Sequence, residues 1–122
     1  MALAAADAVF ALAFAGLLAH ELDAVDKREW RLLYVLRRME EGRARRAFVL
    51  AHVPLVATLL WALLADARTT SLALDAFMVV HAGLHARLSS RTETGFTGPL
   101  SLGLIYGTAA VAALHALLAL WG

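Results

Sequence analysis

The sequence predicts an all-α protein, a bundle of four transmembrane helices, and three observations lead to this fold class. Hydrophobic residues make up 61% of the 122 residues, and the mean hydropathy is +0.70. An average soluble domain contains about 45–50% apolar residues, and so short a chain cannot bury the excess in water. The apolar residues form four long runs, and the basic residues are unevenly distributed between them. We therefore expect one membrane domain over residues 1–122.

The four expected spans cover about residues 2–22, 47–65, 70–88 and 99–121. Each is close to the roughly 20 residues that cross a bilayer, and none shows the alternation of a half-buried strand. We expect the first run to be a retained span, because it lacks the basic residues that precede the apolar part of a signal peptide. The third span contains Asp75 and Arg87, so it should face the other helices and not lipid.

The basic residues predict the orientation. Eight of the eleven Lys and Arg residues lie between Lys27 and Arg46, and Arg87 and Arg91 flank the third connection. The second connection contains only Arg68. Because positively charged connections stay in the cytoplasm, we expect a multi-pass protein of the inner (plasma) membrane with both termini outside.

The connection between the first two spans is expected to form an interfacial amphipathic helix, from Asp26 to Glu41. Leucines recur there near helical spacing while basic residues occupy other faces, and Trp30 and Tyr34 suit the headgroup layer. Lipid phosphate accounts for the basic residues, so the expected partner is the bilayer and no nucleic acid is expected.

Gly103 and Gly107 form a G-x-x-x-G motif in the last span. Small residues allow helices to approach closely in lipid. We favour packing within the bundle, and the alternative is a homodimer through Gly103 and Gly107.

Four histidines fall in one layer near the cytoplasmic face. His20 lies at the end of the first span, and His52, His81 and His85 lie roughly 5–10 Å inside theirs, from the helical rise. His81 and His85 are four residues apart, a spacing that lets two imidazoles bind one metal ion. The layer predicts a metal site. The alternative is that each histidine only hydrogen-bonds a neighbouring helix.

Carboxylates accompany this layer. Asp23 shares a helix face with His20. Glu21 lies about 100° around the helix from His20, and Glu29 follows if the helix continues, so either could act as a base. The chain contains no cysteine, so only nitrogen and oxygen donors are available, and these suit zinc or non-haem iron.

A second polar layer is expected near the outer face, where Asp7, Thr58, Asp75 and His115 reach similar depths. A buried pair of Asp75 and His115 would lower the cost of each in the membrane. We favour a structural role, in which hydrogen bonds between these residues hold the helices together. The alternative is that the layer forms part of a proton or ion path.

The segment His20-Glu21-Leu22-Asp23-Ala24, followed by Glu29-Trp30-Arg31, resembles small bacterial four-helix membrane proteins of unknown function that carry an HELDA…EW signature. This group is similar to the HXXEE-motif membrane family, although Asp23 and Ala24 stand where the two glutamates would. The resemblance implies the membrane fold and points to His20, Glu21, Asp23 and Glu29, but it names no reaction.

The function expected first is a metal-dependent membrane enzyme, of hydrolase or oxidase type, that acts on an amphiphilic or lipid-like substrate at the cytoplasmic leaflet. Zinc or iron would be bound by five residues: His20, Asp23, His52, His81 and His85. Glu21 or Glu29 would act as the general base. Two alternatives stay open: a haem-binding electron-transfer bundle with His52 and His85 as axial ligands, and a non-catalytic membrane subunit or transport-like protein.

Overall fold

The computed structural model describes residues 2–88 and 95–121, with side chains from residue 5 onward. Four α-helices and two short 3₁₀ helices follow one another along the chain, and the described residues contain no strand. They are α1 (Ala2–Asp26), η1 (Glu29–Leu32), η2 (Leu36–Arg38), α2 (Glu41–Ala65), α3 (Ala67–Leu88) and α4 (Pro99–Trp121). The expected all-α class is confirmed.

The helix boundaries have local causes. The carboxylate of Glu40 accepts hydrogen bonds from the backbone N–H groups of Gly42 and Arg43 and so caps the start of α2. Asp66 separates α2 from α3, and its carboxylate accepts the N–H of Thr69 in the first turn of α3. Pro99 begins α4, at the position where its missing N–H costs nothing.

The expected amphipathic helix from Asp26 to Glu41 is wrong. α1 itself continues to Asp26, and the chain then turns at Arg28, which has a left-handed backbone with φ 60° and ψ 47°. Two separate 3₁₀ helices follow. The physical reason is that Glu29 and Trp30 are buried against the bundle, and a straight helix on the membrane surface could not bury both.

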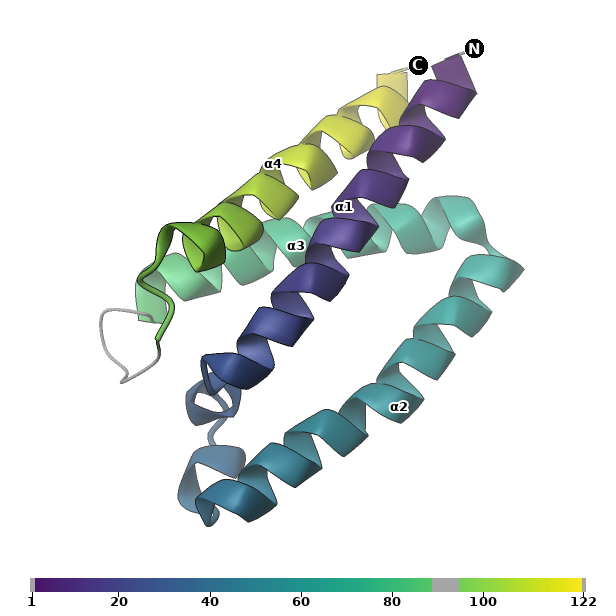
Figure 1. The fold of residues 1–122 in the computed structure, drawn as a ribbon. Coiled ribbons are helices and arrows are strands. Elements are labelled where there is room, and N and C mark those ends of the chain that lie inside the picture. The colour runs from purple at the N-terminus through teal and green to yellow at the C-terminus, as the bar shows by residue number, and fades with distance from the viewer. Residues whose placement is uncertain (1, 89–94, 122) are drawn as a thin grey trace.

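α4 packs against both α1 and α3, whereas α2 diverges from α1 and α4 (Figure 1). The amino and carboxyl ends lie at the same end of the molecule, and the η1–η2 segment and the start of α4 lie at the other. α2 contacts η1 and η2 near its start and α3 elsewhere. Only Ala44 and Phe48 of α2 are buried, so most of its apolar surface is free to meet lipid.

Three helices are long and apolar enough to cross a membrane: Ala5–Asp26, Glu41–Ala65 and Pro99–Trp121. This indicates a membrane protein. α3 is less apolar, and it carries Arg68, Asp75 and Arg87. Its buried face contains Asp75 and His85, as expected for groups that face the neighbouring helices, but Arg87 is exposed, so the expectation is wrong for that residue.

The glycines of α4 do not pack within the chain. A Cβ atom built on Gly103 or Gly107 would meet none of the described residues within 4 Å. Our preferred interpretation, packing within the bundle, is therefore wrong for both. The close contact between α1 and α4 lies at Gly16 instead, where a Cβ atom would overlap the Thr108 hydroxyl. The G-x-x-x-G spacing fails as a guide because the buried face of α4 is set by Ser101, Ile105 and Thr108.

Candidate metal centre

Three histidines and one glutamate converge at the end of the bundle that holds the η1–η2 segment. They are His20 of α1, Glu29 of η1, and His81 and His85 of α3. Each offers one donor atom, and these four atoms all lie within 4.8 Å of one another. The group can hold a metal ion.

Each residue reaches the group for a local reason. His81 and His85 are one turn apart on α3, so their imidazoles share a face. His20 lies on the buried face of α1, in register with Ala13, Leu17 and Ala24. Glu29 arrives differently, because the left-handed turn at Arg28 directs the chain back toward the bundle.

The distances match a small coordination sphere. His81 Nε2 lies 3.0 Å from His20 Nε2 and 3.1 Å from His85 Nε2. The carboxylate oxygens of Glu29 lie 3.3 Å from His20 and His81 Nε2 and 3.4 Å from His85 Nε2. Around zinc, with bonds of about 2.0–2.1 Å, tetrahedral donors lie about 3.3 Å apart.

Hydrogen bonds within the group cannot account for all the close contacts of its imidazole nitrogens. His81 Nε2 has three neighbours, His20, His85 and Glu29, at these distances. One imidazole nitrogen carries either one proton or one lone pair, so it makes one good hydrogen bond. A cation at the centre would satisfy all four donors together.

Three of the four residues of the group are buried, and His81 is partly exposed. His20 and His85 are each only 2% exposed and Glu29 is 8% exposed. The ring of Phe96 covers both histidines, with centroids 5.7 Å from His20 and 4.7 Å from His85. The sequence did not point to Phe96, which lies in the connection before α4 and has no polar signal.

Glu29 is negatively charged in this environment. Burial opposes its ionisation, but hydrogen bonding to His20 and His85, together with the charges of His20 and His81, outweighs burial and lowers the pKa of Glu29 to about 2. The group therefore offers one carboxylate and three imidazoles, a donor set that suits zinc, iron, copper or nickel.

The other predicted site residues lie nearby but outside the group. His52 Nε2 is 2.8 Å from Glu21 Oε2, and its Nδ1 donates to the carbonyl of Phe48 at 2.7 Å. This pair joins α1 to α2. Asp23 Oδ2 and His20 Nδ1 are both buried without a partner among the described residues, one helical turn apart. Glu29, which we expected as a base, joins the histidines instead.

The predicted pair in the outer layer forms. His115 Nδ1 donates to Asp75 Oδ2 at 2.6 Å, and the two side chains are 4% and 1% exposed. Asp7 and Thr58 remain on the exposed surface and do not join the pair. Asp75 and His115 thus link α3 to α4 at the end opposite the histidine–glutamate group.

The space beside the histidines is small. The cavity next to His20 and His81 has a volume of about 10 Å³ and is lined chiefly by apolar side chains. This is about the space of one water molecule, far less than a porphyrin requires. The geometry favours a single ion over haem.

Fold and site together define a class: an all-α protein with membrane-span candidates and a buried histidine–glutamate group that can hold a metal ion. The chain belongs to the family of unknown function DUF6713, which matches residues 6–121. Membership of an uncharacterised family, implied by the resemblance at residues 20–31, is confirmed. No curated protein and no solved structure matches the chain.

Proposed function

We propose that this chain is a metal-dependent membrane enzyme, of hydrolase or oxidase type, that acts on an amphiphilic substrate at the cytoplasmic leaflet. His20, Glu29, His81 and His85 would bind one transition metal ion, zinc or iron. The observation that carries the proposal is the convergence of three Nε2 atoms and one carboxylate. His81 Nε2 lies 3.0–3.1 Å from the other two nitrogens, and the Glu29 carboxylate oxygens lie 3.3–3.4 Å from all three.

In this proposal the metal ion supplies Lewis-acid or redox chemistry. Glu21 takes the role of general base and His52 positions it, because their contact is 2.8 Å and both side chains are about a quarter exposed. The four ligand residues are less accessible, so the Glu21–His52 pair is the polar group that a substrate between α1 and α2 would meet first. His52 and Asp23 are not needed as ligands.

The location of the group supports an amphiphilic substrate. It lies at the end of three apolar helices, beside the connection that contains most of the basic residues. Under the positive-inside rule this end faces the cytoplasm, with both termini outside and the protein in the inner membrane. A substrate with an apolar tail can approach from lipid while its polar head stays at this level.

Elemental analysis of the purified protein tests the metal. We expect about one equivalent of a transition metal per chain, and its loss in His81→Ala. His115→Ala is the matched control, because it removes a buried histidine outside the group and should leave the metal content unchanged. A protein without metal after growth in metal-replete medium would overturn the proposal, and a Soret band would support haem instead.

Two finer points also remain proposals. Gly103 and Gly107 expose a small-residue face on α4, which we propose as a homodimer contact, testable by cross-linking in membranes. We also propose a relationship with the HXXEE-motif membrane family, based on His20 and the acidic residues that follow it. A comparison of the two families' structures at the histidine–glutamate group would test it.

A further inference from the structure

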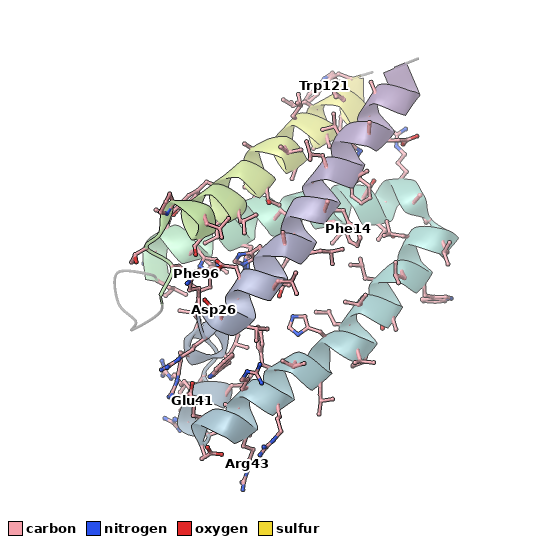
Figure 2. The ribbon with its side chains drawn as sticks, viewed as in Figure 1. Phe14, Asp26, Glu41, Arg43, Phe96 and Trp121 are labelled. Carbon is pink, nitrogen blue, oxygen red and sulfur yellow. The ribbon has the colours of Figure 1, made fainter. Side chains whose placement is uncertain are left out.

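A cavity of about 450 Å³ lies between the end of α1, η1 and the start of α2. Figure 2 shows Asp26 and Glu41 near one another at this end of the molecule. Apolar Leu22, Val25 and Trp30 line the cavity together with charged residues. None of the four metal-binding candidates lines it, but Trp30 directly follows Glu29 in the chain. The cavity is therefore separate from the metal group and adjacent to it.

The charges of the cavity favour an anion. Both of its carboxylates already face basic side chains: Asp26 faces Lys27 at 2.9 Å, and Glu41 faces Arg28 and Arg31. Arg45 also lines the cavity, and it makes no ion pair with any described residue. Two basic and two acidic side chains line the cavity, and the acidic ones are already paired, partly with Lys27 and Arg31 from outside the lining. Arg45 is therefore the charge that is left available to an anionic ligand.

Trp30 supplies an independent indication of a ligand. Its side chain is only 2% exposed, and its Nε1 is buried with no acceptor among the described residues. An indole N–H is a donor only, so what it lacks is an acceptor oxygen. Arg28, the one non-glycine residue with positive φ in the described part of the chain, stands beside the same cavity. Such backbone conformations cluster at binding sites.

The apolar side of the cavity continues toward lipid. Leu22 is 77% exposed, on the part of α1 that faces the membrane under the proposed topology. Leu33, Tyr34 and Val35 of the η1–η2 connection are also exposed, and such residues enter the headgroup layer. A ligand here would have an anionic head among arginines and an apolar tail along α1.

We propose that this cavity binds the phosphate head group of a membrane amphiphile. Arg45 and Arg28 contact the phosphate oxygens, the indole N–H of Trp30 donates to one of them, and the tail lies along Leu22 and Val25. Guanidinium groups match phosphate geometry. The proposal deepens the proposed function by naming its substrate class and rests on that function for any reaction, but binding of the head group does not require the metal ion.

Tryptophan fluorescence tests binding directly. The chain contains three tryptophans, so the double variant Trp61→Phe/Trp121→Phe leaves Trp30 as the sole reporter. In detergent, titration with a short-chain phosphatidic acid should change Trp30 emission in a saturable way. Arg45→Gln in this background should weaken the affinity about tenfold or more, as for loss of a charge-assisted hydrogen bond. Arg43→Gln, an exposed arginine outside the cavity, should leave it unchanged.

Further arms separate the possible outcomes. Short-chain diacylglycerol should bind far more weakly, and equal binding would overturn the role of the phosphate. Inorganic phosphate should bind weakly, and equal affinity would show a free-anion site and overturn the amphiphile. Equal weakening by Arg43→Gln and Arg45→Gln would show only surface attraction. The same titration with His81→Ala should be unchanged, so failure of the metal proposal and failure of this one are distinguishable.

Discussion

Glu29 reaches the histidines because the chain leaves the direction of α1 at Arg28. Its carboxylate is buried and lies 3.3–3.4 Å from three imidazole nitrogens. Without a metal ion, the negative charge of the Glu29 carboxylate would be balanced by protonation of the surrounding histidines. With a cation, the carboxylate lowers the net charge of the centre and completes the donor set.

We expect Glu29→Gln to weaken metal affinity by at least about tenfold, because an amide keeps the shape but loses the charge that favours binding of a cation. A competition titration against a chromogenic chelator would measure this. Glu21→Gln is the matched control, since Glu21 contacts His52 and lies outside the group. Equal losses in the two variants would contradict the ligand role of Glu29.

Only part of this group is predictable from the sequence. The spacing of His81 and His85 and the depth of His20 are properties of single helices, and they predict the shared layer. The contribution of Glu29 depends on a left-handed residue whose conformation Arg28 does not signal. We expected His52 in the same layer, but depth along a helix does not fix how far that helix lies from its neighbours, and His52 contacts Glu21 instead of the other histidines.

At the scale of the helix, the close packing of α1 against α4 depends on Gly16, which is not part of a recognisable sequence motif. Gly16 faces Thr108 so closely that any side chain at position 16 must displace the threonine. The sequence drew attention to Gly103 and Gly107 because of their spacing. Spacing alone does not tell which face of a helix is buried. In α4 the face that carries Gly103 and Gly107 is exposed, and the face that carries Thr108 is buried.

Gly16→Ala should destabilise the protein by about 1–3 kcal/mol, the usual cost of forcing an extra group into a packed contact. Thermal unfolding in detergent would show the loss. Gly103→Ala is the matched control, because its Cβ would enter open space among the described residues. Combining Gly16→Ala with Thr108→Ala should recover part of the stability, and no recovery would argue against a steric cause.

At the scale of the whole molecule, the two connections expected in the cytoplasm lie together. Gly95, which precedes α4, would place a Cβ 3.1 Å from the side chain of Lys27, and Phe96 packs on His20. The amino and carboxyl ends lie at the opposite end (Figure 1). The proposed topology, with an even number of crossings, would place both ends on one side of the membrane, although α3 is less apolar than the other three helices.

The absence of cysteine makes the orientation directly measurable. A thiol introduced by Ala67→Cys, at the first residue of α3, should react with a membrane-impermeant maleimide in intact cells. A thiol introduced by Arg43→Cys, near the start of α2, should react only after the membrane is permeabilised. Both positions are exposed, so accessibility within the protein does not separate them. The reverse labelling pattern would invert the proposed topology.

The position of two proposed ligands on α3 has a consequence for biosynthesis. Asp75 and two arginines should make α3 harder to transfer into the bilayer than α1 and α2, which are long and apolar enough to cross it. α3 is made after α1 and α2. Binding of an ion by His81 and His85, together with His20 and Glu29, would then hold α3 against its neighbours in the membrane. Cells starved of the ion should then accumulate chains in which this segment has not entered the membrane and which quality-control proteases degrade.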